Sequence, residues 1–200
     1  MPQTWGMSAE VRDPLAETPI RRLPIFEGRL LRVYDDEIRF DDGAMAHREV
    51  VEHPGAVCIV ALDGSGRVAL VRQWRHAIGR AVWELPAGTR DRADEAPEET
   101  ARRELLEEVG VTAATWTRLG AWPLAPGYSS EVMHFFLATE FAATIGEPDP
   151  DERLEAGWFD RTVAADLATD DVVDVKTLAG LALVGWDLRF QRRLVAARAV

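Results

Sequence analysis

The sequence predicts an α+β fold, arranged as an α/β/α sandwich in which helices cover the faces of a mixed central sheet. Strand-like and helix-like segments are mixed along the 200 residues, and several strands are separated only by short hairpin turns. The hydrophobic fraction of 47% is enough for a packed core. This length suits one generous domain, or a core domain with a small appendage.

The first fifty residues predict a small β layer ahead of the core. Residues 1–25 are polar and contain prolines, so we expect an extended segment. Between residues 29 and 50, apolar residues alternate around two expected turns, Asp35-Asp36-Glu37 and Asp41-Asp42-Gly43. This pattern indicates a β-hairpin layer or a short antiparallel meander.

The core is expected to follow the boundary His53-Pro54-Gly55. Its helix runs from about Glu95 to Val109, with Pro97 tolerated in the first turn and Gly110 as a left-handed C-cap. The expected strands are 56–62, 67–74, 82–85, 115–122, 131–140 and 155–159, followed by an amphipathic helix over 173–193. The predicted domains are 1–50, the N-terminal extension with its small antiparallel β layer, and 51–200, the core with its C-terminal helix.

Charge and composition exclude several classes of function. The formal net charge of −11 disfavours nucleic acid and anionic membrane surfaces, which both require clustered basic residues. A single cysteine, Cys58, makes an intrachain disulfide impossible, and its apolar surroundings indicate core packing. The N-terminus lacks the features of a secretory signal, and no apolar stretch is long enough to span a bilayer. We therefore expect a soluble, cytoplasmic protein.

The chemistry is concentrated on the helix that precedes Gly110. Glu104, Glu107 and Glu108 lie three and four residues apart, so their carboxylates cluster on one helical face. Like charges at this spacing repel, and a hard divalent cation such as Mg²⁺ would offset the repulsion. Taken alone, these three residues favour the ordinary interpretation, a solvated acidic face.

The residues around this helix resemble the Nudix box, the signature of the Nudix hydrolases. The segment Arg103-Glu-Leu-Leu-Glu-Glu-Val-Gly-Val111 matches every position of its second half, and Glu95 precedes Arg103 at the family's spacing. Six residues separate Gly88 from Glu95, where the common pattern has five. The extra residue falls in the loop before the helix, so the register of the helix is kept.

The resemblance implies a Mg²⁺ site, with Mn²⁺ as an alternative ion. Glu104 and Glu108 would be the principal ligands, Glu107 a third ligand or a holder of water, and the carbonyl of Ala87 a further ligand. Glu95 and Arg103 would form an ion pair that fixes the loop on the helix. From helical spacing alone, Arg103 could equally pair with Glu99, four residues earlier.

Segments beyond the box are similar to the ADP-ribose pyrophosphatase subfamily. They include 53–57, 71–75, 83–88, 125–131 and 174–178, so the likeness covers roughly residues 28–190. It implies substrate-binding roles for Arg75 as a bidentate phosphate ligand, Arg72 as a weaker one, Glu84 toward a ribose, and Gly127 and Glu131 in a cleft loop. The catalytic base would be Glu152, with Glu155 or a box glutamate as alternatives.

The resemblance implies hydrolysis of ADP-ribose to AMP and ribose 5-phosphate, so the expected small-molecule partner is a nucleoside diphosphate sugar, with no nucleic acid or membrane. Another sugar nucleotide such as GDP-mannose, or a non-catalytic module that senses ADP-ribose, are the alternatives; RNA decapping is disfavoured by the charge. The subfamily also implies a homodimer in which the N-terminal β layer packs across the partner.

Overall fold

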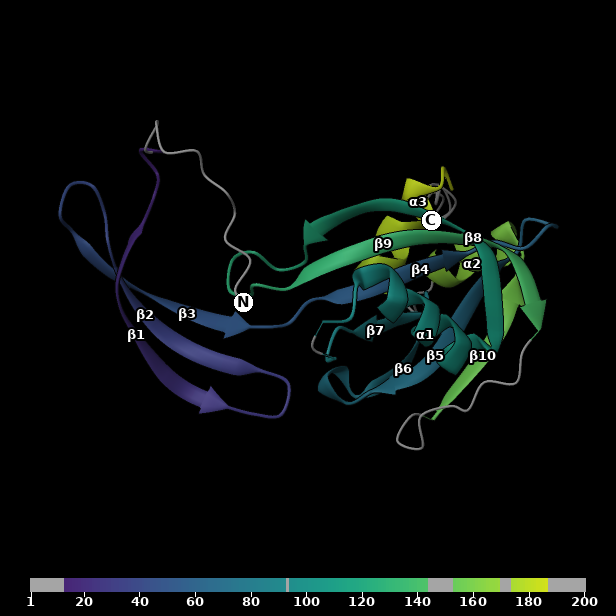
Figure 1. Cartoon of the computed structure of the whole chain (residues 1–200), viewed down its shortest axis with the longest axis horizontal. Coiled ribbons are helices and arrows are strands. Elements are labelled where there is room, and N and C mark those ends of the chain that lie inside the picture. Colours follow the sequence, from purple (N-terminus) through teal and green to yellow (C-terminus); the bar gives the residue numbers. More distant parts are fainter. Residues whose placement is uncertain (1–12, 93, 144–152, 170–173, 187–200) are drawn as a thin grey trace, which may run out of the picture. The chain divides into compact units, whose positions relative to one another are not determined.

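The computed structural model describes residues 13–92, 94–143, 153–169 and 174–186, and its contacts divide the chain into two units. The first unit contains the described residues up to His53 together with residues 125–131. The second unit contains the chain from Pro54 to Leu124 and from Val132 onward. Figure 1 labels the elements of both. Each unit is described separately.

The first unit is an antiparallel meander of β1 (Thr18–Glu27), β2 (Arg32–Arg39) and β3 (Met45–Glu52). The predicted turn at Asp35-Asp36-Glu37 is wrong, because these residues lie in the middle of β2. The strand tolerates them because Arg22, on the adjacent strand β1, forms a bidentate ion pair with the buried Asp36, with bonds of 2.7 and 2.6 Å. Within the segment 1–25, which was expected to be extended, the structure forms the strand β1 from Thr18.

A loop from the middle of the chain completes this unit. Residues 125–131 run beside β3, where the Val51 N–H donates to the Tyr128 carbonyl at 2.7 Å and the Ser130 N–H donates to the Val51 carbonyl at 3.0 Å. The Ser130 hydroxyl accepts from the His53 N–H at 3.1 Å. Backbone pairing of this kind was not expected from the sequence, because the two segments are over seventy residues apart.

The second unit contains two sheets. The mixed sheet has the order β7-β4-β9-β8, in which β4 (Ala56–Ala61) and β9 (Val132–Ala143) are parallel, while β7 (Ala87–Thr89) and β8 (Val111–Pro123) are antiparallel to their neighbours. The second sheet has the order β10-β5-β6 and is antiparallel, formed by Leu154–Phe159, Val68–Arg75 and Arg80–Glu84.

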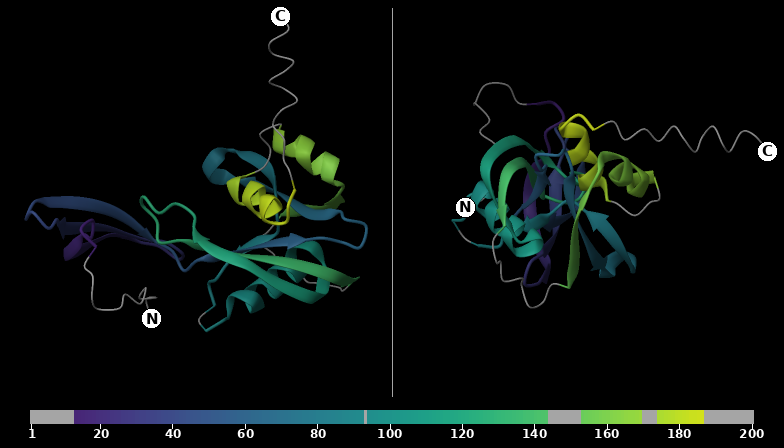
Figure 2. Two further views of the ribbon diagram at one scale, coloured as in Figure 1. Left: turned by 90° about the horizontal axis from the view of Figure 1, so that it is seen from above. Right: turned by 90° about the vertical axis from the view of Figure 1, so that its right-hand side faces the viewer.

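Helices cover both faces of the mixed sheet, as the sandwich prediction requires (Figures 1 and 2). All six residues of β4 are buried. Val57, Ile59 and Ala61 pack with the apolar side of α1 (Pro97–Val109). The alternate residues of β4 pack with α3 (Val175–Leu183) and with Ala164 of α2 (Arg161–Thr169). This continuous burial on two faces explains why β4 contains only apolar residues.

The remaining differences from the predicted elements are shifted ends and short elements that were not expected. The helix α1 begins at Pro97 rather than Glu95, and Gly110 ends it in the left-handed conformation, with φ of 73°. Neither α2 nor β7 was predicted, while a single-turn 3₁₀ segment, η1 (His76–Ile78), connects β5 to β6. The predicted continuous helix over 173–193 is wrong where α3 ends at Leu183, because residues 184–185 form a turn in which Gly185 has a left-handed φ of 76°. Residues 187–193 of the predicted range lie outside the described residues. No helix among the described residues is long and apolar enough to cross a membrane.

Candidate active site

Two carboxylates of α1 are buried against the strand β7. Glu104 and Glu108 are only 6% and 4% exposed, although they lie one turn apart on a helix at the edge of the core. The Ala87 N–H donates to Glu108 Oε2 at 2.9 Å. A Cβ atom on Gly88 would lie 1.9 Å from the carboxyl carbon of Glu104, so a larger residue there would displace this carboxylate. Ala87 and Gly88 therefore lie directly against the two buried carboxylates.

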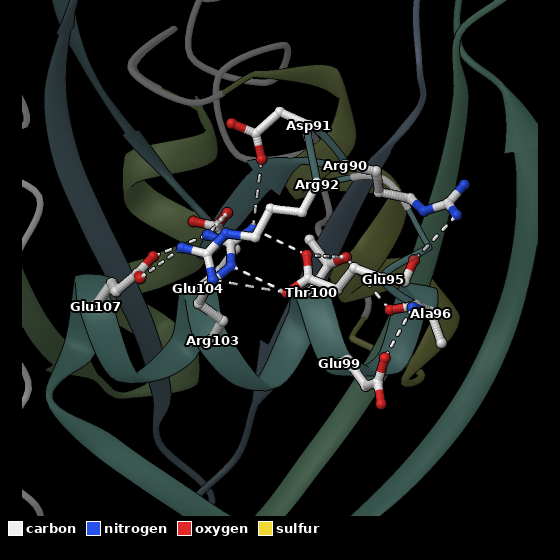
Figure 3. Close-up of polar contacts among 10 residues, drawn as sticks. All are labelled: Arg90, Asp91, Arg92, Glu95, Ala96, Glu99, Thr100, Arg103, Glu104 and Glu107. Atoms are coloured by element: carbon white, nitrogen blue, oxygen red, sulfur yellow. Dashed lines mark hydrogen bonds and ion pairs between the residues drawn. The ribbon is translucent and has the colours of Figure 1, made fainter.

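Arg103 connects the loop before α1 to the acidic face of the helix (Figure 3). Its Nε and Nη2 each lie 3.2 Å from a different oxygen of Glu95. Its Nη1 donates to Glu104 Oε1 at 2.7 Å and to Glu107 Oε2 at 2.9 Å. The alternative partner, Glu99, instead accepts from the Ala96 N–H at 2.9 Å and so closes the first turn of the helix.

The electrostatics of this network favour ionised groups. The hydrogen bonds from Arg103 hold the pKa of Glu95 below its usual value, against the opposing effect of burial, with further help from the Thr100 hydroxyl. Burial by itself would lower the pKa of Arg103, but the bonds to Glu95 and the charge of Glu104 outweigh it and raise the pKa. One guanidinium thus neutralises part of the charge of three carboxylates.

The oxygen atoms around Gly88 are of the kind that bind a hard cation. Carboxylate oxygens and a backbone carbonyl are the ligands that Mg²⁺ takes in proteins, with water or substrate phosphates in the other positions. In the part of the chain that the structure describes, no three acidic, histidine or cysteine side chains converge on one point as they stand. The oxygens of Glu104 and Glu107 face Arg103 instead. The predicted ligands Ala87, Glu104, Glu107 and Glu108 nevertheless lie together, and their chemistry fits the ion.

An open groove of about 750 Å³ lies beside these carboxylates. The C-terminal half of α1 forms one wall, and strands β5, β6 and β10 form the other. Glu107 and Glu108 line it on the helix side, and Arg72 lines it on the strand side, where Arg72 Nη1 is 3.5 Å from Glu155 Oε2. The complete lining is Arg72, Gln73, Trp74, Ala81, Leu106, Glu107, Glu108, Gly110, Arg153, Leu154, Glu155 and Ala156.

Arg75, the last residue of β5, contacts Glu84, the last residue of β6. The Arg75 Nε donates to Glu84 Oε1 at 2.8 Å, and its Nη2 donates to Glu84 Oε2. Glu84 Oε2 also accepts from Lys176 Nζ at 2.8 Å and from Gln73 Nε2 at 3.5 Å. A carboxylate offers about four acceptor positions, two on each oxygen. Three of these donors meet Oε2 and one meets Oε1, so Oε1 keeps an acceptor position that a ribose hydroxyl could use.

Among the predicted site residues, Arg72, Glu107 and Glu108 line the groove itself. Glu152 lies outside the described residues. Gly127 and Glu131 belong to the first unit, where Glu131 Oε1 lies 3.9 Å from Nδ1 of His53. Their predicted roles stay predictions.

Sequence reasoning missed two groups at the site. Lys176, on α3, was noted only as part of a segment similar to the family, yet its ammonium is 8% exposed and bonded to Glu84 and Asp174. Arg92, in the loop before α1, places Nη2 3.8 Å from Glu107 Oε1. Helical spacing could not have revealed either contact, because both join segments distant in sequence or separated by a loop.

Comparisons with known proteins agree with this geometry. The NUDIX domain family matches residues 52–179, which is more than half of the chain. The chain is similar to an ADP-ribose pyrophosphatase of Mycobacterium tuberculosis, with 40% identity over 161 residues, 78% of this chain and 77% of the relative. It is also 37% identical, over 138 residues, to an ADP-ribose pyrophosphatase of Bacillus subtilis, covering 69% of this chain and 74% of the relative.

A solved structure described as an ADP compounds hydrolase has the same fold. Its TM-score is 0.76, with 24% identity, and the match covers 94% of this chain and 99% of that one. The fold, the family match and the two similar relatives lead to one conclusion: the chain belongs to the Nudix family and is a Nudix hydrolase.

Proposed function

We propose that this Nudix hydrolase cleaves the pyrophosphate bond of ADP-ribose by attack of water, giving AMP and ribose 5-phosphate. The observation that carries the proposal is the pair of buried carboxylates, Glu104 and Glu108, held against Ala87-Gly88 at the side of the groove. The names of the two similar relatives, both ADP-ribose pyrophosphatases, support the choice of substrate.

The metal in this proposal is Mg²⁺, with Mn²⁺ as a substitute. Glu104, Glu108 and the Ala87 carbonyl would hold it, and Glu107 would supply a further oxygen or hold a water. When bound, the ion neutralises charge on the pyrophosphate oxygens and lowers the pKa of a water molecule. Glu108 is fixed in advance by the Ala87 N–H at 2.9 Å, so little reorganisation is needed at that ligand.

The arginines of β5 are the proposed phosphate ligands. Arg75 uses Nε and Nη2 on Glu84, and its side chain is still 41% exposed, so its outer edge remains available to an anion. Arg72 is 44% exposed at the rim of the groove, and its ion pair with Glu155 can open toward a phosphate. A guanidinium suits both oxygens of a phosphate at once.

A carboxylate must accept the proton of the attacking water. Glu152 is the proposed base, and Glu155, which is 71% exposed at the groove, is the second choice. We propose further that the protein is a cytoplasmic homodimer in which Gly127 and Glu131 complete the substrate site, with the β1-β2-β3 unit at the subunit contact. A monomer with full activity in dilute solution would refute the dimer proposal.

The direct test is hydrolysis of ADP-ribose with Mg²⁺, beside GDP-mannose and a dinucleoside polyphosphate. We expect AMP mainly from ADP-ribose, and a loss of at least about a hundredfold in kcat for Glu108→Gln. Glu98→Gln is the matched control, because Glu98 lies on the same helix but faces solvent and pairs with Arg102 at 2.7 Å. Preferential turnover of GDP-mannose would change the substrate, and ADP-ribose binding without turnover would indicate a sensor.

A further inference from the structure

The lysine of α3 is unusual in this chain. Lysine and arginine together number 23, and Lys176 is the single lysine among them. It is also buried, with a side chain only 8% exposed, whereas lysine is seldom fully buried unless it is paired. The single position that has lysine instead of arginine is therefore an interior one. A compact ammonium group, rather than a planar guanidinium, suits this position.

Lys176 belongs to a closed group of four charges. Its Nζ is 2.8 Å from Glu84 Oε2 and also contacts Asp174 Oδ2. Glu84, 2% exposed, in turn forms the bidentate pair with Arg75. Two cations and two anions compensate one another, which makes the burial of Lys176 and Glu84 tolerable.

The group joins α3 to the end of β6 at a fixed distance. Asp174 is the N-cap of α3, and its Oδ1 accepts from the Thr177 N–H at 3.0 Å. The Thr177 hydroxyl accepts from the buried Leu85 N–H at 2.8 Å, directly after Glu84. Lys176 therefore leaves an anchored helix terminus and reaches a carboxylate whose own backbone is anchored to the same helix.

The group also lies next to the acidic helix. Residues 73 and 75 share one face of β5, because side chains alternate along a strand, and Gln73 lines the groove. Glu108 and Asp174 are among the charges that raise the pKa of Arg75, after its hydrogen bond to Glu84 and against burial. Glu108, one of the carboxylates that we propose as metal ligands, is thus near enough for its charge to act on the Arg75 guanidinium.

We propose that Lys176 is a positioning residue for substrate binding: by holding the Glu84 carboxylate, it fixes the guanidinium of Arg75 in the orientation that receives a substrate phosphate. This rests on the proposed function, because it takes Arg75 as the phosphate ligand. Lys176 itself contacts no substrate. Without it, Glu84 Oε2 loses its donor from α3, and Arg75 can turn together with the carboxylate.

The test uses Lys176→Met, which keeps the length and apolar stem of the side chain. We expect KM for ADP-ribose to rise about tenfold with kcat changed less than about threefold, because a phosphate contact made in both ground and transition states is weakened. Arg75→Met should have a similar or larger effect on KM. The double variant Arg75→Met/Lys176→Met should be no worse than Arg75→Met alone, since Lys176 acts through Arg75.

A second variant separates positioning from folding. Lys176→Met leaves one uncompensated negative charge, and adding Asp174→Asn restores neutrality while asparagine still caps the helix. We expect the melting temperature of Lys176→Met/Asp174→Asn to recover while its KM stays raised. Arg67→Met is the control for loss of one cation, because Arg67 pairs with Asp63 in the β4–β5 turn at 2.7 Å, and its KM should equal that of the wild type.

Two results would overturn the proposal: a wild-type KM in both Lys176 variants, or a double variant in which the effects of Arg75→Met and Lys176→Met multiply. If the wild type does not turn over ADP-ribose at all, the proposed function fails and the positioning role is decided by NMR. Labelling with ¹⁵N-lysine gives a single side-chain ammonium signal. That signal must shift in Arg75→Met if the two residues are coupled, and an unchanged signal would refute the coupling.

Discussion

Replacing Gly88 with alanine gives a direct test of the contact between β7 and the acidic helix. The new Cβ would lie 1.9 Å from the Glu104 carboxyl carbon and 2.1 and 2.3 Å from its two oxygens. Ordinary contact begins at 3.4 Å, so the carboxylate must move by about 1.5 Å (3.4 − 1.9). Gly88 has no unusual backbone angle, so the effect would come from this collision alone.

The displaced carboxylate loses its position against Arg103. The bond from Arg103 Nη1 to Glu104 Oε1, now 2.7 Å, would break or lengthen, while the bonds to Glu95 and Glu107 remain. We expect a destabilisation of about 1–3 kcal/mol, the usual range for overpacking a well-fitted site. For a chain of this size that corresponds to a melting temperature lower by about 2–4 °C for each kcal/mol.

Activity should fall much further than stability. A proposed metal ligand displaced by more than 1 Å is expected to reduce kcat/KM by about a hundredfold or more. Circular dichroism melts and steady-state hydrolysis of ADP-ribose measure the two effects. Gly64→Ala is the matched control, because a Cβ there meets nothing within 4 Å and its φ is not positive. Wild-type kinetics and melting in Gly88→Ala would refute the placement of Glu104.

Three further predictions concern groups outside this contact. Thr177→Val leaves the buried Leu85 N–H without its acceptor, so thermal melts should reveal a loss of about 1–3 kcal/mol. Cys58 is fully buried and burial raises the pKa of its thiol, so a thiol reagent should label it only after denaturant unfolds the protein; labelling in buffer would contradict its placement in β4. Bonds from Arg103 lower the pKa of Glu95 below its usual 4.5, so Glu95 stabilises the fold above that pH and ceases to do so as the pH falls through its lowered pKa. The stability deficit of Glu95→Gln, measured by urea unfolding, should therefore be largest at neutral pH and shrink in acid.

Features that depend on nearby residues were predictable from the sequence. Gly110 ends α1 because a left-handed residue is needed there, and the residue before Gly110 is the last of the helix. The hairpin turn after β4 also follows from local chemistry, because Asp63 Oδ1 accepts from the Ser65 N–H and the Arg67 N–H, both at 2.9 Å. The positions of Glu104 and Glu108 on one face follow from helical geometry alone.

Features that depend on residues distant in the sequence were not predictable. The acidic run at Asp35-Asp36-Glu37 has the composition of a turn, but it forms part of a strand. Arg22 on β1 bonds to Asp36, and His47 on β3 bonds to Asp35. The pairing of Lys176 with Glu84 joins residues 92 positions apart, and no local pattern marks it. Contacts between distant residues decide both features, and at the acidic run they outweigh the local preference for a turn.

The N-terminal unit can be completed only after the loop 125–131 has been synthesised. Its strands emerge from the ribosome first, but the segment that pairs with Val51 ends at Glu131, 78 residues (131 − 53) after His53. At about 5–20 residues per second, translation of that interval takes roughly 4–16 s. During those seconds the edge of β3 presents unpaired backbone groups, including the Val51 N–H and carbonyl, to the crowded surface of the polysome.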